Sequence, residues 1–438
     1  MTFDDLALSR RALFGNAALL GLGSAFAPHA AFAKPAATAA QFPNVTAFVE
    51  GYVSKRKVPG MLAMMGFGQG KATVIARGTE GFNDSDVETM DTLFRVYSMT
   101  KPVTGMAAMT LIDDGKLSLD QPLSDILPKF AKMMVQVTPD GSITDLRPAK
   151  TPITIRMLLT HSAGLGYSII QKGPIKTAFE EAGVIPGQVS KVPIPGLDRG
   201  KPVGSLTLFA DRLAELPLVY EPGTQWSYSV GLDLMGRVIE VVSGKPFDVF
   251  LQDRLFGPLG MVSTGFQVAA KNIHRLSTNY AVVAGTPFPI DPAEASIFAE
   301  KPPFPMGGAG LVTSPRDYDR FLRMIANYGM IDGKRVMTER AIRTGTSNLL
   351  PPGASTKGTF ANGAGFGAGG RVGLGDAAGT YGWGGAAGTV ALVDLKYGLR
   401  GGLYTQYMPS EAYPVHADFP MAVVADLKAM APRGKKPA

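Results

Sequence analysis

Strand-like patterns at both ends of the chain, with helical patterns between them, constrain the fold most. Two short strand patterns within residues 60–82 predict a β-hairpin near the N-terminus. From about residue 305, glycine-punctuated strand patterns return and continue through "TYGWGGAAGTVALVDLKYGLRGGLYTQ". This arrangement predicts a discontinuous α/β domain, residues 34–115 and 301–438, with a mainly helical domain, residues 116–300, inserted into it.

The composition limits the chemistry available to the chain. Of its 438 residues, 45% are hydrophobic and 18% are charged, which is typical of a globular protein and not of a disordered one. Cysteine is absent, so disulfides, a thiolate nucleophile and cysteine-ligated metals are excluded. The four histidines lie far apart in the sequence, which disfavours a metal hydrolase. We therefore expect no metal site and no cofactor.

The chain is basic, with a formal net charge of +7 and a pI of about 9.3. Its Lys and Arg residues are scattered, however, and accompany neither a basic run nor a zinc pattern, so we expect no nucleic-acid partner. No apolar run is long enough to cross a bilayer, and we expect no membrane span in the mature chain. Nothing in the sequence indicates an oligomeric state.

The N-terminal segment predicts an export signal. Arg10 and Arg11 precede a stretch rich in Ala, Gly and Leu that ends in "AFA", a small-x-small cleavage pattern finishing at Ala33. The pattern is typical of a twin-arginine signal peptide, residues 1–33, and predicts a periplasmic or secreted bacterial protein. The alternative is an apolar tail with no targeting role.

The segment "LFRVYSMTKPVTGMAAM" predicts a strand that turns abruptly into a helix, with Val96 and Tyr97 favouring strand up to Ser98. Pro102 is tolerated only in the first turn of a helix, so the helix must begin close to Ser98. Lys101 then lies on the same helix face as Ser98 and can reach its hydroxyl. A buried lysine can activate a serine nucleophile that has no histidine partner. A second Ser-x-x-Lys, Ser54 to Lys57, predicts only a basic, solvated helix face, so the motif alone is not specific.

Two further segments are candidates for the same site. Tyr228 follows the turn pattern "EPG" and comes just before a predicted helix. Its hydroxyl could accept the proton of a serine, and the alternative is a packed aromatic side chain. In "YGWGGAAGTVALV", Gly384 and Gly385 would let the backbone approach a ligand closely, or Trp383 would simply cap the core of a hairpin.

Several segments, taken in order, resemble the serine β-lactamase-like superfamily, specifically its class C branch and the related family VIII carboxylesterases. They are "RVYSMTK", "GKLSLDQPLSDILPKF", "ITIRMLLTHSAGL", "EPGTQWSYSVGLDLMGRVIEVVSGKPF", "GGAGLVTSPRDYDRF" and "YGWGGAAGTVALV", and they span roughly residues 45–410. The resemblance implies an α/β (α+β) fold of the β-lactamase/transpeptidase type. In that fold an antiparallel sheet is flanked by helices, and the active site lies where it meets the helical domain.

The resemblance also implies roles for individual residues. Ser98 would be the acylated nucleophile, and Lys101 and Tyr228 would handle its proton. The backbone N–H groups of Ser98 and Ala386 would form the oxyanion hole, where one donor contributes about 3–4 kcal/mol. The residues expected to contact substrate are Trp383, Gly384, Gly385 and Val230.

Two departures from the penicillin-recognising relatives indicate the substrate class. Val230 replaces the asparagine of their Tyr-x-Asn pattern, and Trp383 stands in place of the lysine of Lys-Thr-Gly. Losing an amide donor and a cation disfavours anionic β-lactams. We therefore predict a serine carboxylesterase that acts on small-molecule esters through an acyl-enzyme, with weak or no β-lactamase activity. The alternatives are an acyltransferase, an amide or peptide hydrolase, and a non-catalytic penicillin-binding-like protein.

Overall fold

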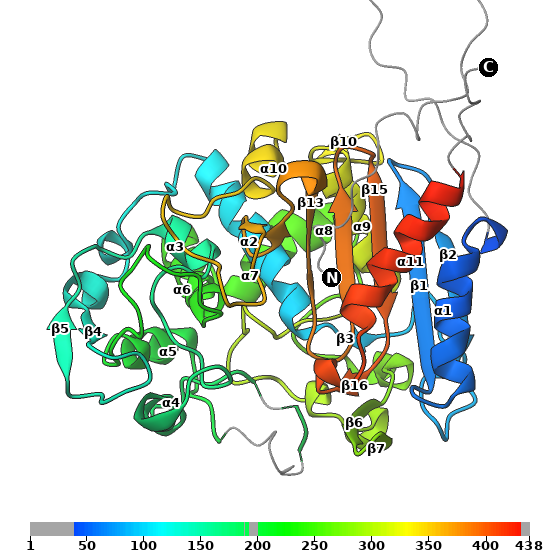
Figure 1. Ribbon diagram of the computed structural model, residues 1–438, viewed down its shortest axis with the longest axis horizontal. Helices are drawn as coiled ribbons and strands as arrows, with labels where there is room; N and C mark the ends of the chain where they lie inside the picture. The colour runs from blue at the N-terminus through cyan, green and yellow to red at the C-terminus, as the bar shows by residue number, and fades with distance from the viewer. Residues whose placement is uncertain (1–38, 188, 192–199, 431–438) are drawn as a thin grey trace, which may run out of the picture.

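The computed structural model describes residues 39–187, 189–191 and 200–430, and a seven-stranded antiparallel sheet runs through it (Figure 1). From one edge to the other, the strands are β11 (Gly365–Phe366), β12 (Arg371–Val372), β13 (Thr380–Gly384), β14 (Val390–Asp394), β15 (Leu399–Tyr404), β1 (Gly60–Phe67) and β2 (Thr73–Gly78). The predicted export signal, residues 1–33, lies outside the described residues.

Strand β1 joins distant parts of the chain in this sheet. It pairs with β2, the next strand in the sequence, which confirms the predicted N-terminal hairpin. Its other neighbour is β15, with Ala63 opposite Leu403 and Phe67 opposite Leu399. The sheet is therefore completed by C-terminal strands, as the return of strand patterns after residue 305 predicts.

Helices cover both faces of the sheet, and β1 is buried on both sides. Met61 and Met65 pack into one core, whereas Leu62 and Met64 point into the other. Because successive strand residues alternate between faces, an all-apolar strand of this kind needs two covering layers. The covering helices are α1 (Pro43–Ser54) and α11 (Val415–Met430) on one face, and α2 (Thr100–Asp113) and α9 (Pro315–Ala326) on the other.

A helical part lies beyond α2, on the side away from the sheet (Figure 1). Helix α2 packs against α6 and α10 and also touches β13, so it lies between the two parts. The elements of this side are α3 (Ile155–Leu159), α4 (Gly173–Glu181), α5 (Leu206–Leu213), α6 (Gly231–Ser243), α7 (Phe247–Leu251), α10 (Glu339–Gly345) and the hairpin β4 (Met134–Gln136) to β5 (Leu146–Pro148). The short helix α8 (Gly257–Leu259) contacts α9 instead.

The remaining short strands are β3 (Phe94–Arg95), β6 (Asn279–Val283), β7 (Thr286–Asp291), β8 (Val312–Thr313), β9 (Met330–Ile331), β10 (Lys334–Arg335) and β16 (Tyr407–Met408).

Some contacts cross the predicted residue limits of the two domains. Strand β6, from the middle of the chain, pairs in parallel with β16 near its end. A second contact of this kind is a backbone hydrogen bond at 2.8 Å, which the Trp226 N–H, in the predicted helical domain, donates to the Ser355 carbonyl, in the predicted α/β domain. The residue limits of the two domains therefore stay a prediction.

Within residues 39–187, 189–191 and 200–430, no helix is long and apolar enough to cross a membrane. In the same residues, no cluster of three or more His, Asp or Glu side chains is arranged to hold a metal ion.

Candidate active site

Ser98 lies at an abrupt turn between β3 and α2. The expectation of a strand through Tyr97 is wrong, because β3 ends at Arg95 and a 3₁₀ turn, Tyr97–Met99, leads directly into α2. Tyr97 has a positive φ of 39°, which is uncommon for a bulky residue and tends to occur at functional sites. Pro102 occupies the first turn of α2, as predicted, where its missing N–H costs no helical hydrogen bond.

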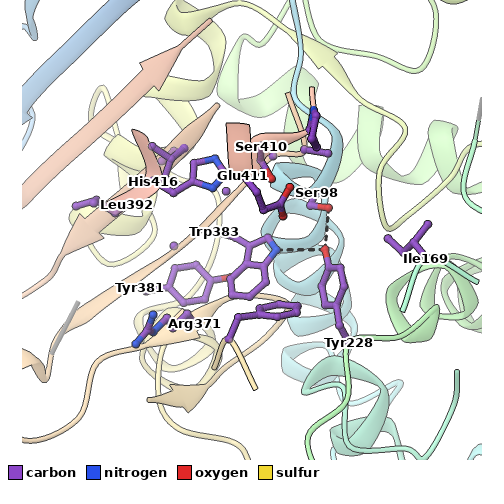
Figure 2. Close-up of a pocket in the computed structure, with 18 of the residues that line it drawn as sticks. Ser98, Ile169, Tyr228, Arg371, Tyr381, Trp383, Leu392, Ser410, Glu411 and His416 are labelled. Atoms are coloured by element: carbon purple, nitrogen blue, oxygen red, sulfur yellow. Dashed lines mark hydrogen bonds between the residues drawn. The ribbon is translucent and has the colours of Figure 1, made fainter. Parts of the chain in front are cut away.

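Ser98, Lys101 and Tyr228 converge, although Tyr228 is 130 positions away from Ser98 in the sequence. Figure 2 shows the Tyr228 hydroxyl directed at Ser98 Oγ, and the two oxygens lie 2.7 Å apart. Lys101 Nζ lies 3.4 Å from the same serine oxygen and 4.5 Å from the centroid of the Tyr228 ring. A serine hydroxyl with a phenol and an amine in reach can pass its proton to either of them.

Lys101 is buried behind Ser98, with no exposed surface. Its Nζ donates a hydrogen bond to the Gly308 carbonyl at 2.7 Å and faces the ring of Tyr167, whose centroid is 5.7 Å away. A buried ammonium needs such acceptors, because the energy lost on leaving water must be recovered inside the protein. The lysine is therefore held in one place beside the serine.

Strand β13 brings a second set of predicted residues to Ser98. A Cβ added to Gly385 would lie 2.4 Å from the Val96 carbonyl, so only glycine lets the chain approach the turn that carries Ser98 this closely. Ala386 follows Gly385 and lines the same cavity as Ser98. The indole Nε1 of Trp383 donates to the Tyr228 oxygen at 3.3 Å (Figure 2).

The cavity at Ser98 has a volume of about 530 Å³. Its walls are largely apolar, and at its rim Phe360 and Ile169 are 56% and 43% exposed. Large apolar side chains left open to solvent at a cavity are suited to an apolar ligand group. The lining includes Ser98, Ile169, Ile170, Tyr228, Phe360, Arg371, Tyr381, Trp383, Gly384, Gly385, Ala386, Leu392, Ser410, Glu411 and His416.

Val230 does not join this group. Of the residues predicted to contact substrate, Trp383, Gly384 and Gly385 line the cavity, whereas the Val230 side chain is fully buried and does not. Val230 is the N-cap residue of α6, and its N–H donates to the Gly166 carbonyl at 3.2 Å. Its position does not support a contact with substrate.

The buried His161 supports Tyr228 from behind. Its Nδ1 accepts a hydrogen bond from the Ser229 N–H at 3.2 Å, and its ring centroid lies 4.8 Å from that of Tyr228. Burial, with the nearby charge of Lys101, lowers the pKa of His161 well below its ordinary value. A histidine held neutral in this way packs and orients the tyrosine and carries no charge.

Three charged residues near the site escape prediction from the sequence. Glu411 and Arg371 line the cavity, and Asp233 is buried close to Lys101. Glu411 comes from the loop after β16 and Arg371 from β12, where no motif marks them. Asp233 stands in the first turn of α6, where an acidic residue is usual at any helix start and so gives no signal.

Comparison with known proteins places this geometry in a family. The family model described as "Beta-lactamase" matches residues 45–425, nearly the whole described chain. The chain therefore belongs to the β-lactamase family, within the β-lactamase/transpeptidase-like superfamily of serine hydrolases. The predicted resemblance and the predicted fold class are both confirmed.

Individual relatives support the esterase-related branch. The chain is 34% identical over 275 residues to Protein Rv1367c of Mycobacterium tuberculosis, a match covering 60% of this chain and 62% of that protein. It is 31% identical over 334 residues to Esterase EstB of Burkholderia gladioli, covering 70% of this chain and 76% of EstB. The solved structure of EstCE1, described as a hydrolase with promiscuous acyltransferase activity, matches with a TM-score of 0.68 and 25% identity. That match covers 89% of this chain and 98% of EstCE1.

Proposed function

We propose that this chain is a serine carboxylesterase, which cleaves carboxylic esters through an acyl-enzyme on Ser98. The observation that supports this most is the meeting of three side chains, of which Ser98 and Tyr228 line an apolar cavity and Lys101 lies buried behind them. The Tyr228 hydroxyl lies 2.7 Å from Ser98 Oγ, and Lys101 Nζ lies 3.4 Å from it. Similarity to EstB and EstCE1, both described as hydrolases or esterases, points the same way.

In the mechanism that we propose, Tyr228 accepts the proton of Ser98 during acylation. In the reactive state Tyr228 is a phenolate and Lys101 an ammonium, whose charge stabilises the phenolate beside it. Ser98 Oγ attacks the ester carbonyl carbon while its proton moves to the Tyr228 oxygen. The N–H groups of Ser98 and Ala386 hold the oxyanion, and one such donor lowers the barrier by about 3–4 kcal/mol. The alcohol oxygen then leaves with the proton from Tyr228, and the acyl group stays on Ser98.

Deacylation uses the same groups in reverse. A water molecule gives one proton to Tyr228 while its oxygen attacks the acyl carbonyl carbon. Collapse of this second tetrahedral intermediate breaks the bond to Ser98 Oγ, which takes the proton back from Tyr228. The Nε1 of Trp383, 3.3 Å from the Tyr228 oxygen, favours the phenolate at each step in which it forms.

The substitution Ser98→Ala tests the nucleophile. It should abolish turnover of p-nitrophenyl acetate without unfolding the protein, because only the attacking oxygen is lost. A fluorophosphonate probe should add one adduct to the wild type, mapped to Ser98 by peptide mass, and none to the variant. Unchanged turnover in a clean preparation of the variant would remove Ser98 from the mechanism.

The substrates best suited to this cavity are neutral esters. Trp383 offers apolar area and no positive charge, and its N–H is already directed at Tyr228. Glu411 adds a carboxylate to the same lining and Arg371 a guanidinium, so these two side chains bring no net positive charge that would favour a substrate carboxylate. Burying a neutral acyl or alcohol group against the apolar wall contributes about 25 cal/mol per Å².

An acyltransferase is the second candidate, supported by the description of EstCE1. Water and an alcohol compete for one acyl-enzyme, so the two functions differ only in the acceptor. Turnover of p-nitrophenyl butyrate with and without n-butanol separates them. Butyl butyrate formed in place of butyrate identifies the transferase, whereas butyrate alone identifies the hydrolase. A protein that takes the probe and turns over neither would be penicillin-binding-like, and one that prefers anilides would be an amide hydrolase.

We also infer that the chain is exported. The inference rests on the twin arginines, Arg10 and Arg11, and on the cleavage pattern ending at Ala33. The intact mass of protein recovered from the periplasm or medium should correspond to a chain beginning at Lys34. Full-length protein confined to the cytoplasm would refute the inference.

A further inference from the structure

A buried carboxylate stands behind the proposed proton-handling pair. Asp233, in the first turn of α6, is only 1% exposed. Its Oδ1 accepts a hydrogen bond from the Gly308 N–H at 2.7 Å, and no hydrogen-bond partner for Oδ2 is found among the described residues. A Cβ on Gly308 would lie 2.5 Å from Oδ2, so the contact requires glycine at 308.

Gly308 binds Asp233 and Lys101 at once. Its N–H donates to Asp233, and its carbonyl accepts from Lys101 Nζ, each at 2.7 Å. The carboxylate on α6 and the ammonium on α2 are therefore held on either side of one residue. Figure 1 shows α2 and α6 as neighbours at the junction of the two parts of the molecule.

The charges around Lys101 make Asp233 distinctive. The titratable groups that face Lys101 are Tyr228, Tyr167, His161 and Asp233. His161 is neutral, so among the groups described around Lys101 only Asp233 supplies a full negative charge to this buried side chain in the resting protein. Burial raises the pKa of Asp233 to about 6, against the opposing effect of Lys101, so the carboxylate is mostly ionised at pH 7.

We propose that Asp233 is a positioning residue for Lys101: through Gly308 it fixes the carbonyl that receives Nζ, and its charge keeps the buried ammonium in place beside Tyr228. Without that charge, Lys101 Nζ keeps only neutral partners and is held less firmly beside Ser98 and Tyr228. This deepens the proposed function and rests on it for its kinetic consequence. The electrostatic link between Asp233 and Lys101 does not depend on which substrate is cleaved.

The kinetic test compares Asp233→Asn with the wild type on p-nitrophenyl butyrate across pH 5–8.5. Asparagine keeps the shape and the acceptor for Gly308 but has no charge. Above pH 7, kcat should fall about tenfold or more with KM little changed, since Asp233 does not line the cavity. The ratio of wild-type to variant kcat should shrink as pH falls through about 6, where the wild-type carboxylate also becomes neutral.

Asp317→Asn is the matched control. Asp317 is likewise 1% exposed and in the first turn of a helix, α9, but its carboxylate accepts hydrogen bonds from Ser263 and Thr264 instead. Its pH profile should overlay that of the wild type. A constant ratio of wild-type to Asp233→Asn rates at every pH would overturn the proposal, because a merely structural role gives no pH signature.

A stability cycle keeps the proposal testable if Asp233→Asn is inactive or folds poorly. Lys101→Met should lower the melting temperature more at pH 8 than at pH 5, because it leaves a buried carboxylate unpaired only where Asp233 is ionised. Adding Asp233→Asn to Lys101→Met should recover part of that loss. If Lys101→Met lowers the melting temperature equally at pH 5 and pH 8, the electrostatic link between Asp233 and Lys101 is wrong. If the wild type hydrolyses no ester while the cycle behaves as expected, the proposed function fails and the link between the two residues stands.

Discussion

Trp383 has two separate effects at the candidate site. Its ring forms part of the apolar cavity wall, and its Nε1 donates to the Tyr228 oxygen at 3.3 Å. The indole N–H is directed at the proposed base. Trp383 should therefore influence the rate of proton transfer as well as the choice of substrate.

Trp383→Phe separates the two effects, because phenylalanine keeps an aromatic wall and removes the N–H. We expect kcat on p-nitrophenyl butyrate to fall about tenfold, which corresponds to ~1.4 kcal/mol, with KM nearly unchanged. Steady-state kinetics measure both parameters. An unchanged kcat together with a raised KM would mean that Trp383 is only a wall.

Charge at the cavity should decide between neutral esters and carboxylate-bearing β-lactams. The wild type should prefer p-nitrophenyl butyrate to nitrocefin by about a hundredfold or more in kcat/KM, or ~2.7 kcal/mol. Trp383→Lys should narrow that ratio by adding a cation, and Glu411→Gln should narrow it by only about fivefold because Glu411 is exposed. The exposed Glu215→Gln serves as the control. Equal activity on both substrates in the wild type would contradict the assignment as an esterase.

Local spacing allowed Ser98 and Lys101 to be predicted, because Ser98 lies in the turn directly before the helix that carries Lys101, and Pro102 limits where that helix can begin. Tyr228 could be joined to them only through the family resemblance, since no local rule relates residues 130 positions apart. Val230 was misplaced because a pattern does not show which way an N-cap side chain points. Its side chain turned into the core, where an apolar residue is more stable.

The segment after β2 contains two buried carboxyl groups that make stability depend on pH. Glu80 and Glu88 are 6% and 5% exposed, and the strand-like contact of Thr79 with Val87 holds them on adjacent turns of chain. Burial raises the pKa of Glu80 to about 7, and burial with the charge of Glu80 raises that of Glu88 well above its ordinary value. Thr92 donates to Glu80 at 2.7 Å and partly opposes the shift.

Raised pKa values in the folded state mean that the folded protein binds these protons more tightly than the unfolded chain. The resulting stabilisation is fully present below the unfolded pKa, near 4.5, and is lost as pH rises through about 7. The melting temperature should therefore fall by ~3 °C or more between pH 5 and pH 8, followed by circular dichroism. The double variant Glu80→Gln, Glu88→Gln should flatten this slope, whereas Glu215→Gln should leave it unchanged. If the melting temperature of the double variant falls with pH as steeply as that of the wild type, groups other than Glu80 and Glu88 cause the pH dependence.

The element pattern was predicted more fully than the element boundaries. Alternating and all-apolar runs identified β1, β2 and the C-terminal strands, because burial on one or two sheet faces leaves a period in the sequence. The position where β3 ends was missed, since Tyr97 has strand propensity but adopts a left-handed backbone. The pairing of β6 with β16 was also outside prediction, because strands of five and two residues give little pattern.

One carboxylate, on α11, forms hydrogen bonds to the start of α1 and so connects the two ends of the described chain. Asp426, fully buried near the end of α11, accepts hydrogen bonds from the Asn44 and Val45 backbone N–H groups at 2.9 and 3.0 Å, and from Asn44 Nδ2 at 2.6 Å. The N-cap residue of α1, Phe42, supplies no side-chain cap of its own. Asp426 therefore caps α1 from a helix 382 positions away, at the end where the helix dipole favours negative charge.

Asp426→Ala should destabilise the whole protein by about 2–3 kcal/mol, because it leaves the buried Val45 N–H and the partly buried Asn44 N–H without an acceptor. Asp426→Asn should cost less, since its amide oxygen still accepts. Urea unfolding followed by fluorescence measures the difference, with the exposed Lys428→Ala on the same helix as the control. A change below ~0.5 kcal/mol for Asp426→Ala would show that packing between α1 and α11 suffices.

The pairing of β1 with β15 means that β1 must wait for its partner strand while the chain is synthesised. The two strands meet residue for residue from Leu62 opposite Tyr404 to Phe67 opposite Leu399, so β15 leaves the ribosome long after β1. At about 5–20 residues per second, the wait is roughly 20–70 s. During that time α1 can already cover one face of the β1–β2 hairpin, but the edge of β1 that pairs with β15 stays open, and an unpaired apolar strand edge is prone to aggregate. The newborn chain should therefore depend on a chaperone until its last hundred residues are made, and deleting β15 and α11 should leave it insoluble.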